Sequence, residues 1–319
     1  MVKFNLLFLS LFFCINSFSQ DLKRVDQVIL SYQKATSIES LAKRIDYDFK
    51  TKTEKVRAIY TWIALNIEYD YYNTKSLKPP QFITYTNNFD LKRIQNREKK
   101  EVINKTFNDK KGICNNYALL FNKLCNLINL DNELVLGYVK SSINEIGIIP
   151  FNKNHIWNAV KINEKWMLFD ATYGSGYVYK DVWQQELNLE YFNVKKEKLR
   201  LTHFPSDKKW QTFLNQKPLA TFCYEPFYQN AFLKYNVEIL EPKIGEIKII
   251  DNKKIHLKIK KSKNTNNIKY FFSHENIIKT PKIKNRNLIT DLYFPNPNKD
   301  TYLHIYIENE LALQYKIKL

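Results

Sequence analysis

The chain has 319 residues, of which 44% are hydrophobic, and its formal net charge is +18 at pH 7. This length accommodates two domains and a substantial core, and the apolar content excludes a globally disordered chain. The positive charge could attract nucleic acid, a membrane surface or an anionic envelope polymer. Lysine is spread along the whole chain, and no nucleic-acid reader motif is recognised, so we expect no nucleic-acid partner.

The first residues have the pattern of a targeting segment. Lys3 precedes an apolar run over 4–15, and small residues follow up to Ser19. This pattern predicts a cleaved signal peptide over 1–19 and a secreted or periplasmic protein. The run is shorter than the about 20 residues that span a bilayer, and no later stretch is long enough, so no transmembrane anchor is expected. Cys14 makes lipid anchoring the alternative, although the residue before it is bulkier than a lipidation signal requires.

The region after this segment is predicted to be mainly helical. Residues 21–49 carry a helical stripe of apolar side chains. Thr51, with Glu54 three residues later, resembles a capping box at the start of another helix. Residues 71–96 are polar and contain two prolines, which predicts a long loop of the kind that often forms a lid or a binding surface. A helix is expected again over 97–107.

The chain is organised around a cysteine at the start of a helix. Gly112 is expected to permit a tight turn with unusual backbone angles, and a helical stripe begins soon after it. A thiol in the first helical turn faces the positive end of the helix dipole and unpaired N–H groups, which favour the nucleophilic thiolate. Cys114 is therefore a candidate nucleophile. A buried structural cysteine is the alternative interpretation of this residue alone.

Two later residues could activate this thiol. His155 and Asp170 lie in two strand-like segments that a short turn connects. If Ile162 pairs with Lys165 across that turn, His155 and Asp170 lie diagonally on one face, about 7 Å apart between backbones. An imidazole and a carboxylate can interact over that separation. With Cys114 they form a candidate Cys-His-Asp triad.

The motifs Gly-Ile-Cys, His-Ile-Trp-Asn and Phe-Asp-Ala-Thr, in this order, resemble the transglutaminase-like superfamily over about 25–214. Downstream motifs, including Thr-His-Phe-Pro, are similar to the branch of the kyphoscoliosis peptidase and the fungal cytokinesis proteins. The resemblance implies an α+β fold with a papain-like core of helices and an antiparallel sheet. It also implies that Cys114 is the nucleophile, His155 the base and Asp170 the orienting acid.

The other cysteines and histidines suggest no further site. Cys125 lies eleven residues beyond Cys114 on the same helix, about 16 Å away at 1.5 Å per residue, so the two cannot form a disulfide. His203 has no acid at a useful spacing in the sequence and is expected to make a structural contact. Neither a spaced zinc pattern nor a calcium loop is evident, so we expect no metal and no cofactor.

The character of the chain changes near Phe222. Short alternating apolar runs, separated by turn residues, predict an all-β, Ig-like antiparallel sandwich. The predicted organisation is therefore a signal peptide over 1–19, a transglutaminase-like catalytic domain over 20–221 and a β-sandwich domain over 222–319.

These features predict a secreted thiol enzyme that acts on peptide or protein amides through an acyl-enzyme. Resolution by water would make it a protease or amidase, and resolution by an amine would make it a transamidase. The alternative is a non-catalytic binding or scaffold protein of the cell envelope that retains the triad. The expected partner is a protein or peptide substrate, and an anionic cell-envelope polymer is a further candidate.

Overall fold

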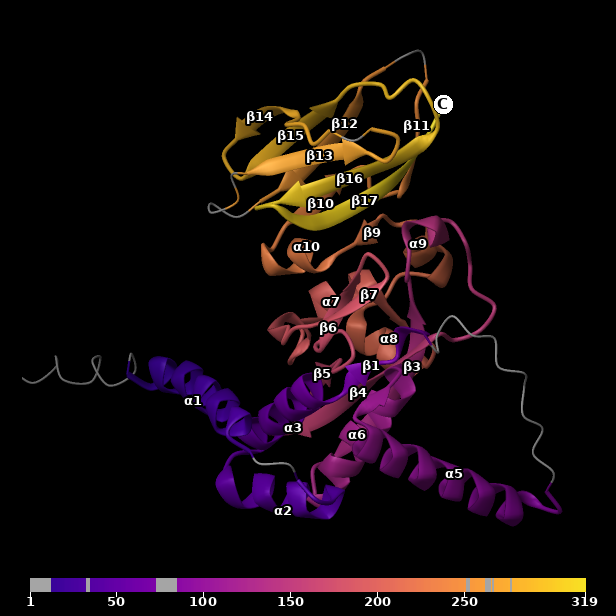
Figure 1. Ribbon diagram of the computed structural model, residues 1–319. Helices are drawn as coiled ribbons and strands as arrows, with labels where there is room; N and C mark the ends of the chain where they lie inside the picture. The colour runs from indigo at the N-terminus through magenta and orange to yellow at the C-terminus, as the bar shows by residue number, and fades with distance from the viewer. Residues whose placement is uncertain are drawn as a thin grey trace, which may run out of the picture. The chain divides into compact units, whose positions relative to one another are not determined.

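The computed structural model describes residues 13–32, 35–72, 85–250, 253–261, 265, 267–275 and 277–319 (Figure 1). Most of the predicted signal peptide and residues 73–84 of the predicted long loop over 71–96 lie outside these residues. The loop prediction was wrong for 88–96, which form the start of helix α5 (Asn88–Asp109). Among the helices in the described part of the chain, none combines the length and the hydrophobicity needed to cross a membrane.

The first half of the described chain is mainly helical. The expected helical region over 21–49 is interrupted, because Ser37 starts a new helix with its side chain accepting a hydrogen bond from the backbone N–H of Ser40. The capping box predicted at Thr51 and Glu54 is confirmed. The longer helices are α1 (Phe13–Leu30), α2 (Ile38–Asp48), α3 (Lys52–Asn66), α5 (Asn88–Asp109) and α6 (Cys114–Leu127).

Helix α3 is the centre of the helical core. Every residue from Val56 to Ala64 is buried, as expected for a helix that other elements surround. Arg57 lies within this run, and its guanidinium donates two hydrogen bonds to Asp26 of α1 at 2.8 and 2.7 Å. The hydroxyl of Thr61 donates a third bond to the same carboxylate. The buried charge is therefore paired, which burial of an arginine requires.

A four-stranded sheet in the order β5-β4-β3-β8 supports the candidate site. Ile162 pairs with Lys165 in antiparallel β4 and β5, so the predicted register is confirmed. The strands of this sheet are β3 (Asn132–Val139), β4 (His155–Ile162), β5 (Lys165–Phe169) and β8 (His203–Pro205). Shorter pairs are β1 (Glu68–Tyr69) with β2 (Lys111–Gly112), in parallel, and β6 (Gly176–Tyr179) with β7 (Val182–Gln185).

The remaining helices are short and lie between β3 and the C-terminal strands in the sequence. They are the 3₁₀ helices η1 (Ile143–Glu145) and η2 (Leu189–Tyr191), followed by α7 (Lys196–Thr202), α8 (Lys208–Leu214), α9 (Leu219–Tyr224) and α10 (Asn230–Lys234).

The C-terminal region forms two sheets with alternating burial. Side chains from both sheets, such as Leu257 and Ile305, line one small internal cavity, so their apolar faces meet. The pairing is antiparallel, except that β11 runs parallel to β17. The first sheet contains β10 (Glu238–Glu241), β12 (Ile255–Lys260), β15 (Ile289–Phe294) and β14 (Lys282–Arg286). The second contains β11 (Glu246–Lys248), β17 (Glu310–Lys318), β16 (Thr301–Ile307) and β13 (Ile268–Phe272), and β9 (Phe227–Tyr228) also pairs with β17.

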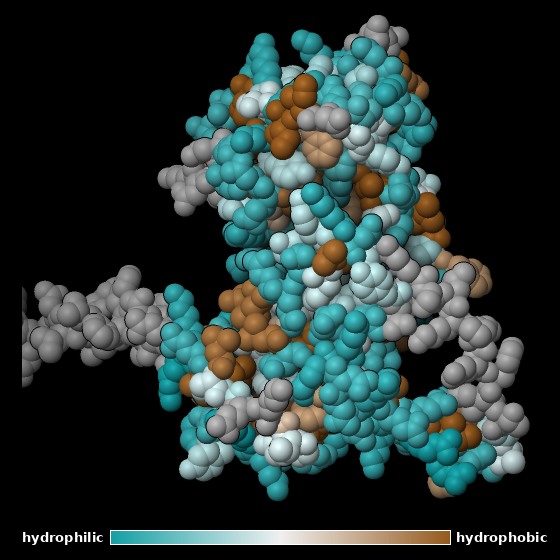
Figure 2. Space-filling model, in the orientation of Figure 1, coloured by the Kyte–Doolittle hydropathy of each residue, from teal (hydrophilic) through white to brown (hydrophobic). Residues whose placement is uncertain are grey.

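Contacts divide the chain into two compact units. One comprises 1–135 with 156–194, and the other comprises 136–155 with 195–319. The second unit therefore joins the segment before β4 to the C-terminal sheets. Figure 2 shows a face that is mainly hydrophilic, with smaller hydrophobic areas scattered over it.

Candidate active site

Cys114 is the first residue of α6, as the sequence predicts, and its side chain is partly exposed. Asn116 fixes this end of the helix. Its Oδ1 accepts a hydrogen bond from the backbone N–H of Ile113 at 3.1 Å, and its Nδ2 donates to the hydroxyl of Thr106 on α5 at 2.7 Å. The start of α6 is thereby anchored to the neighbouring helix.

Gly112 serves a different purpose from the predicted one. Its φ is not positive; among the described glycines, only Gly147 and Gly176 have positive φ. A Cβ atom at Gly112 would instead lie 2.4 Å from the Cβ of Asn116. A glycine is required here because the side chain of Asn116 occupies the space that a Cβ atom would need. The expectation of an unusual backbone angle was wrong.

Cys114, Cys125 and Cys223 are all unbridged. Burial raises the pKa of Cys125, which lies in the core. Burial also raises the pKa of Cys223, although nearby Lys140 opposes the effect. Cys114 is the one of the three that is accessible, so it is the thiol best placed to meet a substrate.

Two partly buried tyrosines are affected by the charges of both the thiol and the candidate acid. The pKa of Tyr69 is raised, mainly by burial and then by the charges of Cys114 and Asp170. The pKa of Tyr173 is raised by burial, by Tyr191 and by the same two groups. The charges of Cys114 and Asp170 therefore both raise the pKa of each tyrosine.

Asp170 follows directly after β5 and is 1% exposed. Its Oδ1 accepts hydrogen bonds from the backbone N–H groups of Thr172 and Tyr173, at 2.8 and 3.0 Å. The turn that supplies these donors is closed by the N–H of Gly174, which donates to the carbonyl of Asp170 at 2.9 Å. One carboxylate oxygen is thus fixed by the backbone, which sets the orientation of the whole group.

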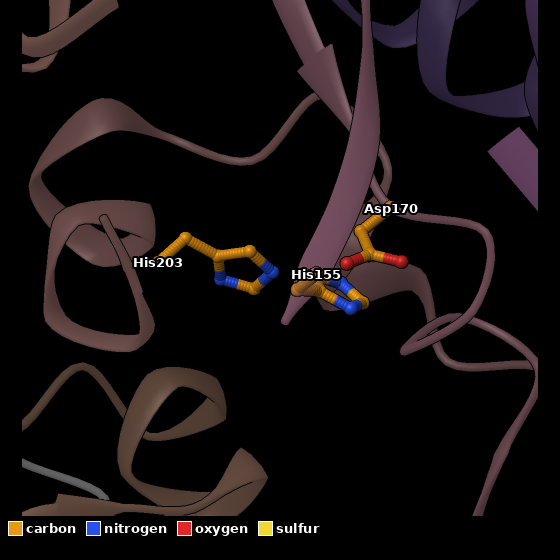
Figure 3. A group of neighbouring side chains, drawn as sticks. All are labelled: His155, Asp170 and His203. Atoms are coloured by element: carbon orange, nitrogen blue, oxygen red, sulfur yellow. The ribbon is translucent and has the colours of Figure 1, made fainter. Parts of the chain in front are cut away.

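His155 is the first residue of β4 and is also buried. The β4–β5 ladder ends where Asn158 pairs with Phe169, so one further step in the same register sets Trp157 against Asp170. His155 lies two residues along from Trp157, on the same face of the strand. Potential ligand atoms of His155, Asp170 and His203 all lie within 4.8 Å of one another (Figure 3).

His203 is the residue that sequence reasoning assigned incompletely. It is fully buried at the start of β8, where it pairs with Val139 of β3. Its ring meets that of His155 edge-on, with the centroids 5.3 Å apart, and its Nδ1 lies 2.8 Å from the hydroxyl of Thr202. No acid stands at a useful spacing from it in the sequence, but folding brings Asp170 close to it. The Thr-His-Phe-Pro motif was the available signal.

Two imidazoles and a carboxylate are donors that zinc accepts. Around a tetrahedral zinc, with bonds of 2.0–2.1 Å, such donors would be about 3.4 Å apart. The 4.8 Å limit on the separations in this group is wider, so the side chains would have to close around an ion. A metal held here would also occupy the imidazole that the triad needs as a base. The neighbouring histidine and acid can equally act without one, as base and orienting group.

Cys114 begins a helix, His155 begins a strand and Asp170 follows the adjacent strand, which is the arrangement of elements expected for the predicted triad. The resemblance to the transglutaminase-like superfamily is confirmed: residues 39–171 match the family model of that description, and this segment contains Cys114, His155 and Asp170.

The relatives support the resemblance to the branch of the kyphoscoliosis peptidase. The chain is 27% identical over 247 residues to Kyphoscoliosis peptidase from Homo sapiens and 26% identical over 247 residues to that from Mus musculus. Each comparison covers 75% of this chain, which spans only 34% of the relative. A solved structure described as "Crystal structure of a TGase" covers 56% of this chain and 43% of its own, with 15% identity and a TM-score of 0.29.

Proposed function

We propose that this chain is a thiol enzyme that acts on peptide or protein amides through an acyl-enzyme. The observation that carries the proposal is the accessible Cys114 at the start of α6, within a superfamily segment that also contains the adjacent His155 and Asp170. The electrostatic effect of both Cys114 and Asp170 on Tyr69 and Tyr173 supports their proximity.

The proposed reaction has two halves. In the first, the Sγ thiolate of Cys114 attacks the amide carbonyl carbon, and the C–N bond breaks as protonated His155 gives its proton to the leaving amine or ammonia. In the second, water or an amine attacks the thioester, His155 accepts the proton released by the nucleophile, and the thiolate leaves. Asp170 holds the imidazole in the tautomer and orientation that both halves need.

Water as the second nucleophile gives a protease or amidase, and an amine gives a transamidase. Both reactions use the same catalytic residues. They differ only in which nucleophile, water or an amine, reaches the acyl-enzyme after the first product leaves. The printed names of the relatives include a peptidase and a TGase. We propose both reactions as candidate activities of this chain.

The test is to treat the folded full chain with iodoacetamide and to locate the adduct by mass spectrometry. We expect carbamidomethylation at Cys114 and protection of Cys125 and Cys223, because both are buried and their pKa values are raised. Incubation of a separate, unalkylated sample with a peptide mixture should give a thioester adduct on Cys114. Cys125→Ser should keep both results, and Cys114→Ser should lose both.

Labelling confined to Cys125 and Cys223 would contradict the proposal. So would a Cys114 that iodoacetamide labels in one sample but that never forms an acyl adduct or turns over a peptide in an unalkylated sample. Either result would favour the scaffold alternative.

We also propose that the protein is secreted or periplasmic after removal of residues 1–19, that 20–221 is the catalytic domain, and that 222–319 is an Ig-like sandwich. Two sheets whose apolar faces share an internal cavity support the last assignment. N-terminal sequencing of the exported protein tests the first: an N-terminus that still begins at Met1 would contradict it. The basic charge makes an anionic cell-envelope polymer a proposed second partner.

A further inference from the structure

The segment over 141–154 connects β3 to β4 and ends directly at His155. It presents three large apolar side chains to solvent: Ile148 is 57% exposed, Ile149 is 54% exposed and Phe151 is 96% exposed. We call these three residues the apolar tip. Isolated exposed apolar residues are common, but a cluster of large ones is typical of a surface that contacts a partner.

The base of this segment is held firmly while the tip is exposed. The ammonium group of Lys316 on β17 donates to the carbonyls of Asn144 and Ile146, at 2.9 and 2.5 Å. The hydroxyl of Tyr302 on β16 donates to the Oδ1 of Asn144 at 2.6 Å. The N–H of Gly147 donates to the carbonyl of Cys223 at 2.9 Å. These bonds fix the backbone that presents the tip.

A groove of about 430 Å³ adjoins this segment. A Cβ atom at Gly147, the residue that precedes the tip, would lie 3.6 Å from the ring of Tyr224, which lines the groove, so the groove lies beside the start of the tip. Lys217 donates to Glu225 at 2.6 Å, which pairs the carboxylate and leaves the exposed Lys243 as the basic group of the rim. The lining residues are Lys217, Ala220, Thr221, Tyr224, Glu225, Lys243 and Ile244.

The tip is close enough to His155 to meet a bound substrate. Phe151 precedes His155 by four residues, so their backbones are at most about 14 Å apart at 3.3–3.6 Å per residue. An extended peptide advances about 3.3 Å per residue. A peptide whose amide lies at His155 can therefore place a side chain up to about four residues away against the tip.

We propose that the apolar tip and the groove bind a segment of the polypeptide substrate with apolar side chains and acidic neighbours, within about four residues of the reacting amide. The apolar tip and the groove floor supply the hydrophobic contact, and the basic rim supplies the charge complementarity. The inference rests on the proposed function and extends it by naming the substrate class. It also gives β16 and β17 a role, since Tyr302 and Lys316 hold the segment in place.

Binding should be measured apart from catalysis, with the full-length Cys114→Ala chain and two fluorescein-labelled peptides of twelve residues. One peptide carries Leu-Phe-Leu flanked by aspartates, and the other has serine at those three positions. By fluorescence anisotropy we expect the apolar peptide to bind at least about tenfold more tightly. Phe151→Ser should weaken its binding by about tenfold, and Lys243→Gln should reduce the advantage of the flanking aspartates.

The matched control is Phe89→Ser, because Phe89 is 79% exposed on α5, outside both the tip and the groove. It should leave peptide binding unchanged. Equal binding of the two peptides, or an equal loss in Phe89→Ser and Phe151→Ser, overturns the inference. So does self-association that Phe151→Ser abolishes without peptide binding, since the tip would then contact a second copy. Peptide binding by Cys114→Ala without turnover by the native chain would overturn the proposed function and leave the binding surface standing.

Discussion

Lys140 offers a direct test of how the segment before His155 is anchored. It follows β3, is 7% exposed, and donates from Nζ to the carbonyl of Phe222 at 2.6 Å. Burial lowers its pKa from the ordinary 10.5 to about 8, against an opposing effect of Glu225. A difference of about 2.5 units corresponds to about 3 kcal/mol at about 1.4 kcal/mol per unit.

The sign follows from proton binding in the two states. Below pH 8 the folded and unfolded chains both carry the charged lysine, and the folded state bears the whole cost of about 3 kcal/mol. Between about pH 8 and pH 10.5 the unfolded chain binds more protons, so the contribution of this group to stability rises with pH. Lys140→Met removes this dependence, along with a hydrogen bond that contributes about 1 kcal/mol at any pH.

Urea unfolding of both chains at pH 7, 8, 9 and 10 measures the difference directly. The stability of Lys140→Met relative to the native chain should fall by about 2 to 3 kcal/mol across this range, and all other titrations cancel in the comparison. Lys92→Met, at an exposed position on α5, should show no such trend. A constant difference between Lys140→Met and the native chain from pH 7 to pH 10 would refute the reasoning, because the ammonium group would then bear no cost of burial.

Two further substitutions test the packing that places the site. Asp26→Asn leaves the buried guanidinium of Arg57 without its counter-charge and should lower the free energy of unfolding in urea by about 3 to 5 kcal/mol. The control Asp109→Asn, in an exposed ion pair, should lower it by under about 1 kcal/mol. A loss under about 1 kcal/mol for Asp26→Asn would mean that solvent reaches this pair. Gly112→Ala forces its methyl group against Asn116 and should cost about 1 to 3 kcal/mol, while Asn115→Ala on the exposed face of α6 should be nearly neutral. Equal stability of Gly112→Ala and the native chain would contradict the steric account.

Local sequence patterns were sufficient to predict single helix starts and the pairing of two strands that are adjacent in the sequence. The turn between β4 and β5 fixed the pairing of Ile162 with Lys165, and period-two alternation then placed His155 and Asp170 on one face. The capping box at Thr51 was readable because its two residues are three apart. Gly112 was misinterpreted because its neighbour in space is a side chain four residues later, and a sequence pattern shows no side-chain volume.

His203 marks the limit of that approach. Its proximity to His155 depends on the pairing of β8 with β3, which joins residues more than sixty positions apart. An acid at a useful spacing along the chain was therefore the wrong criterion. Non-local pairing is what brings a group of this kind together, and no periodicity in the sequence encodes it.

The contacts of the segment over 141–154 decide how catalysis and scaffolding can be separated experimentally. Deleting 222–319 removes the carbonyl of Cys223, the hydroxyl of Tyr302 and the ammonium of Lys316, which hold this segment. It also removes the carbonyl of Phe222, which accepts a hydrogen bond from Lys140, just before the segment. Loss of function after such a deletion would follow under either interpretation, because the segment ends at His155. A single change at Cys114 leaves these bonds in place. An unchanged phenotype in Cys114→Ala, combined with a lost phenotype in Lys316→Met, would therefore favour a binding role over amide chemistry.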